Sequence, residues 1–145
     1  MKQAGYSGRP LSAKLGLKTG MTCWRHKMPP GIAGILDEQE PGQRVLNAPE
    51  AGHACAHIFV TERDELADLL DSLRGLLAPD GMIWVSWPKK SSKVPTTVTE
   101  DVIREICLPT GLVDVKVCAV DDVWSGLKLV IRKELRIDQA QKLAK

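Results

Sequence analysis

Hydrophobic positions in the middle of the chain follow two different periods. From Leu66 to Leu77 leucines recur three and four residues apart, which predicts an amphipathic helix. Residues 82–87 are apolar on both sides except at Ser86, the pattern of a central strand covered by helices on both faces. A mostly apolar run at 54–60 predicts a neighbouring strand just before the helix. This order of strand, helix and strand indicates a parallel unit.

The remaining segments extend the same alternation of strands and helices. We expect short helices near 11–17 and 32–36, strands at 21–27 and 43–47, and a helix after the capping box formed by Thr97 and Glu100. Two segments, 113–117 and 127–131, alternate cleanly, as in an antiparallel pair at the edge of a sheet. We therefore predict a three-layer, mostly parallel, Rossmann-like α/β sheet of about six strands with an antiparallel C-terminal edge strand.

Three segments organise the chain. Residues 1–20 are expected to form an N-terminal arm with a short helix, and residues 21–133 the α/β domain. The charged tail at 134–145 is expected to fray or to form a short exposed helix.

Composition narrows the functional classes. With 145 residues, 43% of them hydrophobic, the chain is long enough to bury a core. Its 20 basic and 18 acidic residues give a net charge of +2, without the basic excess of a nucleic-acid-binding protein. It has no apolar run of membrane-spanning length and no signal-peptide pattern, and its four cysteines form no C-x-x-C pair. We expect a cytoplasmic protein that binds neither nucleic acid nor membrane.

Several segments resemble known families. The run LLAPDGMIW at 76–84 is similar to the helix end, turn and hydrophobic strand of class I S-adenosylmethionine-dependent methyltransferases. Five further segments resemble a family of short bacterial proteins of unknown function that have a methyltransferase-like fold: GYSG at 5–8, KLG at 14–16, VSWPKK at 85–90, LVDVKVC at 112–118 and WSGLK at 124–128. The resemblance implies a bacterial protein and a fold, without an activity.

The turn after the first predicted strand differs from a usual cofactor-binding turn. Such turns are rich in glycine, because the backbone must approach the ligand and donate N–H groups to it. Here the turn reads Met-Pro-Pro-Gly at 28–31, and two prolines remove two donors. Pro30 and Gly31, with Asn47 and Glu50 after the second strand, are the candidates for a degenerate cofactor site. We expect no bound cofactor, with S-adenosylmethionine as the alternative.

Two loops are predicted to meet at the carboxyl edge of the sheet, where open parallel sheets bind ligands. They span residues 86–97 and 121–125. The candidate ligand-binding residues in them are Ser86, Trp87, Lys89, Lys90, Asp121, Trp124 and Ser125. The lysines would attract an anion and the tryptophans would form an apolar wall. Alternatively, the lysines are solvated, the tryptophans pack in the core and the acidic residues belong to a turn.

Metal binding and classical catalytic motifs have less support in the sequence. His53, Cys55 and His57 would project from one face of a strand, and Cys23 and His26 lie on a possible neighbour. The spacing is not usual for zinc, so we expect no metal site, but a buried Cys55 and a hydrogen-bonded His57. Neither a Ser/His/Asp arrangement nor a P-loop is present, and no catalytic residue is assigned.

The sequence therefore favours a degenerate methyltransferase-like domain that is not an enzyme. It would bind a small anionic ligand or a protein partner at the carboxyl edge of its sheet. The first alternative is an enzyme, an S-adenosylmethionine-dependent methyltransferase with an atypical cofactor loop. The second is a structural module that forms homodimers through an exposed sheet edge or the N-terminal arm.

Overall fold

A computed structural model of the chain describes residues 9–144. The strands are β1 (Thr22–His26), β2 (Arg44–Leu46), β3 (His53–Phe59), β4 (Leu77–Pro88), β5 (Leu112–Ala119) and β6 (Trp124–Ile131). The α helices are α1 (Leu11–Lys14), α2 (Pro30–Gln39), α3 (Arg63–Arg74), α4 (Glu100–Cys107) and α5 (Arg136–Leu143). The expected elements are all present, with ends that differ by a few residues. The segment at 5–8 lies outside the described residues.

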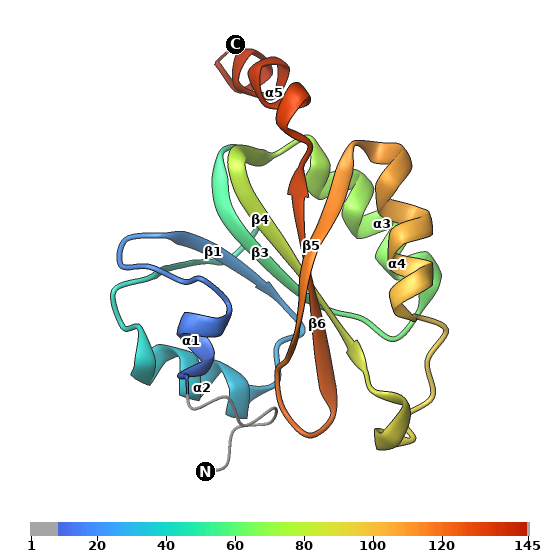
Figure 1. The fold of residues 1–145 in the computed structure, drawn as a ribbon. Coiled ribbons are helices and arrows are strands. Elements are labelled where there is room, and N and C mark those ends of the chain that lie inside the picture. The colour runs from blue at the N-terminus through green and yellow to red at the C-terminus, as the bar shows by residue number, and fades with distance from the viewer. Residues whose placement is uncertain (1–8, 145) are drawn as a thin grey trace.

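All six strands form one sheet in the order β2-β1-β3-β4-β6-β5 (Figure 1). The pairs among β2, β1, β3 and β4 are parallel, whereas β6 is antiparallel to both β4 and β5. The prediction of a mostly parallel α/β sheet whose last strand is antiparallel is therefore confirmed. The position of this last strand differs from the prediction of an edge strand. Strand β6 lies between β4 and β5, so that β5 is the edge strand.

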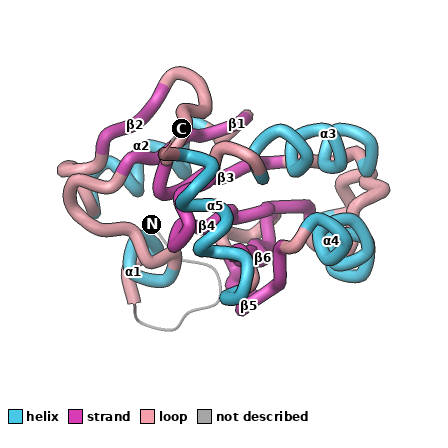
Figure 2. The backbone as a smooth tube through the Cα atoms, turned by 90° about the horizontal axis from the view of Figure 1, so that it is seen from above, coloured by secondary structure: helices cyan, strands magenta, loops and turns pink. Residues whose placement is uncertain are grey.

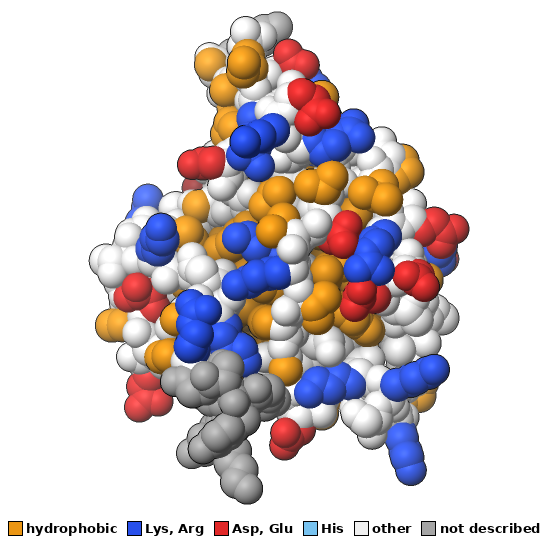
Figure 3. All heavy atoms as spheres, viewed as in Figure 1, with side chains coloured by type: hydrophobic (Ala, Val, Ile, Leu, Met, Phe, Trp, Pro, Cys, Tyr) orange, Lys and Arg blue, Asp and Glu red, His pale blue; other side chains and the backbone are white. Residues whose placement is uncertain are grey.

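Helices cover the two faces of the sheet in pairs (Figures 1 and 2). One face packs against the leucines of α3 and against Ile103 and Cys107 of α4. The other packs against α1 and α2, through residues that include Leu15 and Leu36. Strand β4 contributes alternately to both clusters, which explains why its sequence is apolar on both sides. The edge strand β5 is more exposed, at Val115 and Val117 in particular (Figure 3 shows apolar side chains over this part of the sheet).

The starts of α3 and α4 are tied to each other, in a way the capping box did not predict. The cap of α4 is Thr99, whose hydroxyl oxygen accepts a hydrogen bond from the Val102 amide at 3.2 Å. Thr97 instead accepts one from the amide of Arg63, the first residue of α3, at 2.7 Å. The prediction of Thr97 as the N-cap of this helix was therefore wrong by two residues, because the N-cap is Thr99. The hydroxyl of Thr97 stabilises the neighbouring helix rather than its own.

The C-terminal tail forms a helix, as expected, but this helix is docked on the domain. Gln139 of α5 is buried, and its amide nitrogen donates to the carbonyl oxygens of Leu77, at 2.8 Å, and Arg74, at 3.1 Å. The Arg74 guanidinium in turn donates to the Gln139 amide oxygen at 2.7 Å. A fraying tail could not hold these contacts. The helix therefore packs at the end of the sheet opposite to the carboxyl ends of the parallel strands (Figure 1).

Candidate ligand site

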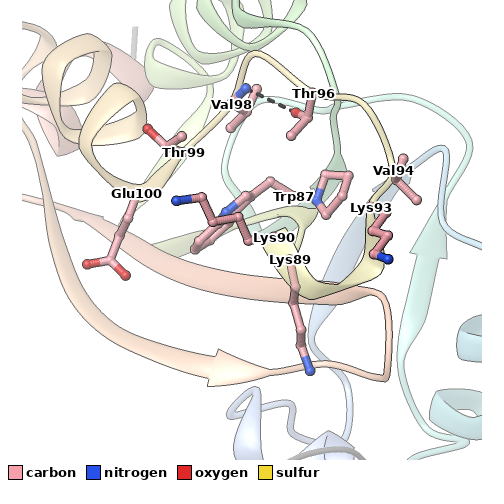
Figure 4. Close-up of a pocket in the computed structure, with 10 residues that line it drawn as sticks. Trp87, Lys89, Lys90, Lys93, Val94, Thr96, Val98, Thr99 and Glu100 are labelled. Carbon is pink, nitrogen blue, oxygen red and sulfur yellow. Dashed lines mark hydrogen bonds between the residues drawn. The ribbon is translucent and has the colours of Figure 1, made fainter.

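A cavity of about 500 Å³ lies where β4 ends and the chain crosses to α4 (Figure 4). Trp87 and Pro88 close β4 on one side of it, and Val98 and Thr99 precede α4 on the other. Its volume is that of a small-molecule site. The apolar wall comes from Trp87 and Val98, which are both buried. A ligand here would contact rigid elements rather than a loop alone.

Three lysines surround this cavity, and none of the described residues forms an ion pair with them: Lys89, Lys90 and Lys93. In Figure 4 the Lys90 side chain extends on the same side as Trp87, toward Thr99, whereas that of Lys89 points away from it. The carboxylate of Glu100 also lines the cavity, but it is paired with Arg104 of the same helix. The cavity therefore carries a net positive charge, and Lys90 is the lysine best placed to use it.

The backbone around the cavity is fixed by hydrogen bonds to neighbouring segments. The amide of Lys89 donates to the carbonyl oxygen of Val123 at 2.7 Å, which joins the end of β4 to the loop before β6. The hydroxyl of Thr96 and the amide of Thr97 both donate to the carbonyl oxygen of Thr61, at 2.7 and 2.9 Å respectively. The long loop is therefore anchored at both ends. Between them, Lys93 adopts a left-handed conformation with φ of 60°.

The two tryptophans proposed to share this site lie on opposite faces of the sheet. Trp87 belongs to the core beneath α3 and α4. Trp124 lies on the face covered by α1 and α2, where it packs edge to face against Phe59, with the ring centroids 5.0 Å apart. The register explains this, because Trp87 pairs with Ser125, and Trp124 pairs with Pro88 one position along. The prediction of one crevice walled by both tryptophans is wrong. Ser125 shares the face of Trp87 instead.

Ser86 and Asp121 are engaged elsewhere. Ser86 is fully buried on the face opposite to Trp87, with its hydroxyl 2.7 Å from Nε2 of His57, which burial keeps neutral by lowering its pKa to about 3. The Asp121 carboxylate accepts hydrogen bonds from the amides of Val123 and Trp124, at 2.9 and 2.8 Å, as a turn residue does. The structure therefore brings together Trp87, Lys89 and Lys90 and leaves these two out. Sequence reasoning missed Thr99 and Glu100, which only the position of α4 brings to the cavity.

The turn between β1 and α2 does not fit S-adenosylmethionine. Pro29 caps α2 and Pro30 is its first residue, and the amides of residues 32 and 33 donate to the Pro29 carbonyl oxygen. Only the Gly31 amide remains to donate at this helix start. Lys27, before the prolines, makes the sharp turn with φ of 55°, a conformation that usually favours glycine.

An ion pair from α3 also crosses this turn. The Glu65 carboxylate lies 2.6 Å from Nζ of Lys27 and 3.2 Å from Nε2 of His26. Burial alone would raise the pKa of Glu65, but the hydrogen bonds to Lys27 and His26 outweigh it and lower that pKa. Asn47 and Glu50 are exposed after the short strand β2. None of the four candidate cofactor residues lines the cavity beside Trp87. The residues present therefore offer few donors and a crossing salt bridge where the cofactor's carboxylate and ribose would need open, polar space.

Two arrangements are absent from the described residues, a metal-binding cluster and a membrane-spanning helix. No group of three or more His, Cys, Asp and Glu side chains in this part of the chain is arranged to hold a metal ion. Within residues 9–144, no helix is both long enough and apolar enough to cross a membrane.

Several solved structures that resemble this fold are methyltransferases. Mitomycin 7-O-methyltransferase aligns with a TM-score of 0.61 and 11% identity over 78% of this chain, which spans about half (49%) of that chain's length. A SAM-dependent methyltransferase from Aquifex aeolicus aligns with a TM-score of 0.60 and 14% identity, over 83% of this chain and 88% of the other. Magnesium protoporphyrin IX methyltransferase from Synechocystis PCC 6803, solved with bound SAH, aligns with a TM-score of 0.54 and 11% identity, over 83% of this chain and 78% of the other. At these identities the likeness shows a methyltransferase-like fold.

No curated protein matches the sequence. One family profile does, and it covers residues 41–133, which include β3, β4 and the whole cavity beside Trp87. Its description is "Protein of unknown function (DUF3052)". Since the match spans more than half of the 145 residues, the chain belongs to the DUF3052 family.

Proposed function

We propose that this protein is a methyltransferase-like domain without methyltransferase activity, which binds a small anionic ligand in the cavity between β4 and α4. The observation that carries the proposal is the combination of a 500 Å³ cavity, a tryptophan wall and lysines that form no ion pair with any described residue. The turn between β1 and α2, with its two prolines and the Lys27–Glu65 ion pair, supports the absence of S-adenosylmethionine binding. Fold alone does not determine activity.

The lining of the cavity indicates the class of ligand. Trp87 and Val98 offer an apolar surface, and the lysine ammonium groups offer charge but no planar, bidentate contact. The ligand best suited to this set combines a ring or other flat apolar part with a phosphate or carboxylate. A protein partner that presents such a group, for example on an aromatic and acidic segment, would use the same contacts.

Phenyl phosphate is a suitable probe, because it joins one ring to one dianion. We expect it to bind in calorimetric titrations of the full chain, and to bind more weakly as salt rises, since exposed charges are screened over about 8 Å at physiological ionic strength. Replacing Lys90 by alanine should weaken binding about fivefold, the loss of one charged contact near solvent of about 1 kcal/mol. The thermal midpoint should stay nearly unchanged, because Lys90 is exposed.

Lys89→Ala is the matched control, since it removes the same charge from the adjacent residue, whose side chain points away from Trp87 in Figure 4. It should weaken binding less than about twofold. Equal losses in both variants would mean that the probe senses only the general charge of the loop. Unchanged binding in Lys90→Ala would contradict the proposed site directly.

S-adenosylmethionine is the second candidate ligand. The similar structure of the Synechocystis methyltransferase, solved with bound SAH, favours it. It would have to bind at Gly31, Asn47 and Glu50 with the single free donor of α2, or displace Glu65 from Lys27. We rank it below the anionic ligand for this reason.

A further inference from the structure

Two cysteines, a methionine and a histidine line a second, much smaller cavity on the other face of the sheet, beneath α2. Cys23 of β1 and Cys55 of β3 are directly opposite each other in the register of the two parallel strands. His57 follows two residues later on the same face of β3, and Met28 reaches the cavity from the turn after β1. The cavity measures about 10 Å³, room for one water-sized particle. It thus gathers two thiols, one thioether and one imidazole.

The two cysteines face each other across neighbouring strands. Cys23 and Cys55 are partners in the parallel register of β1 and β3, and both side chains are buried. A metal ion that binds both sulfur atoms would take the place of their protons.

Polar groups around the cavity lack partners among the described residues. The amide oxygen and nitrogen of Gln43 are both buried without a hydrogen bond, although the side chain lines the cavity. His57 uses Nε2 toward Ser86, and no described residue hydrogen-bonds its Nδ1 atom. Buried polar groups are usually satisfied by protein, water or an ion. A water molecule or an ion in this cavity would satisfy the amide of Gln43.

We propose that this cavity binds one soft monovalent metal ion, Cu(I) in the cell, through the sulfur atoms of Cys23 and Cys55 with Met28 as a weaker third ligand. Thiolate and thioether ligands select Cu(I), which accepts two or three of them. Two thiolates and Cu(I) carry one net negative charge, and the Arg25 guanidinium lines the same cavity, although it also pairs with Asp37 at 2.8 Å. Zinc is disfavoured, because it requires four ligands in a tetrahedron. Coordination releases the thiol protons to solvent and changes no oxidation state.

The earlier expectation of no metal site considered a different set of residues. It weighed zinc at His53, Cys55 and His57, with Cys23 and His26 on the neighbouring strand. In the structure His26 pairs with Glu65, and His53 does not line this cavity. The methionine that joins the set comes from a turn, where its sequence position gave no indication of metal binding.

The test is an anaerobic competition between the full-length protein and a chromogenic Cu(I) chelator, with ascorbate as reductant. We expect one Cu(I) per chain and a thiolate-to-copper absorption band in the ultraviolet. Cys23→Ser/Cys55→Ser should weaken binding by at least about 100-fold, and Met28→Leu by about tenfold. Cys107→Ser/Cys118→Ser, the matched control, removes the chain's other two cysteines and should keep the wild-type affinity.

Met28→Leu leaves both buried thiols in place, so it tests the site even if the double serine variant fails to fold. Circular dichroism identifies that failure. Loss of binding in the Cys107/Cys118 variant, or no stoichiometric Cu(I) binding by the wild type, would overturn the proposal. Wild-type affinity in both Met28→Leu and the single variant Cys23→Ser would also overturn it.

Discussion

Replacing Trp84 by alanine is expected to destabilise the protein by about 4 kcal/mol, the range measured when a large aromatic side chain is removed from a core. Trp84 is fully buried in the centre of β4, and it is the largest side chain of the core. Its indole N–H donates to the carbonyl oxygen of Leu15 at 2.9 Å, which fastens the segment after α1 onto the sheet. The truncation removes both the packing and this hydrogen bond. Urea unfolding followed by circular dichroism measures the loss.

Two variants separate these contributions. Trp84→Phe keeps most of the apolar volume and leaves the Leu15 carbonyl without its donor, so we expect a loss of about 1–3 kcal/mol. Trp24→Ala removes a tryptophan that is only partly buried, against the other core cluster, and should cost less than Trp84→Ala. A loss below about 1 kcal/mol in Trp84→Ala would mean that the N-terminal segment does not pack on β4 as described.

Acid is expected to destabilise the protein strongly through His57. Burial lowers the pKa of His57 to about 3, whereas an unfolded chain would titrate it near 6.5. Between these values the unfolded state binds one proton more, so the stability that neutral His57 contributes is complete above about pH 6.5 and is lost as pH falls. At about pH 4.5, two units below the unfolded value, the loss from this residue is about 3 kcal/mol.

His57→Gln is the variant that isolates this effect. The glutamine amide can still pair with the Ser86 hydroxyl, but it does not titrate. The free energy of unfolding, measured at about pH 7.5 and pH 4.5, should fall by about 3 kcal/mol more in the wild type than in the variant. His53, whose pKa burial also lowers, and Glu65 are present in both proteins and cancel. If the free energy of unfolding falls by the same amount in both proteins, His57 is protonated in the folded state as easily as in the unfolded state, which contradicts the prediction.

Local patterns in the sequence predicted the elements well. The leucine spacing of α3 and the two-sided apolarity of β4 correspond to helices and strands that are buried as expected. These signals depend on which side of one element faces the core, and the periods of 3.6 and 2 residues encode that directly. The antiparallel direction of β6 was also correct. The position of β6 between β4 and the edge strand β5 was not predicted. Alternation of apolar and polar residues reveals a partly exposed face but not the order of the strands.

What the sequence could not provide was register between distant strands. Trp87 and Trp124 fall on opposite faces because their strands pair with an offset of one residue. Such an offset moves every side chain of a strand to the other face. The same uncertainty hid the pairing of Ser86 with His57 and of Cys23 with Cys55. Hydroxyl groups were equally ambiguous: Thr97 and Thr99 are both plausible caps, and only the approach of α3 assigns Thr97 to Arg63.

The central claim is that the ligand site of this methyltransferase-like domain lies at the end of β4 rather than at the turn between β1 and α2. Amide NMR spectra of the full chain, titrated separately with phenyl phosphate and S-adenosylmethionine, test it most directly. We expect saturable shifts with phenyl phosphate at residues 87–100, and no saturable shifts with S-adenosylmethionine at an affinity of about 10 μM or tighter, roughly −7 kcal/mol. Saturable binding of S-adenosylmethionine at that affinity, with shifts concentrated at residues 26–31 and 47–50, would contradict the claim.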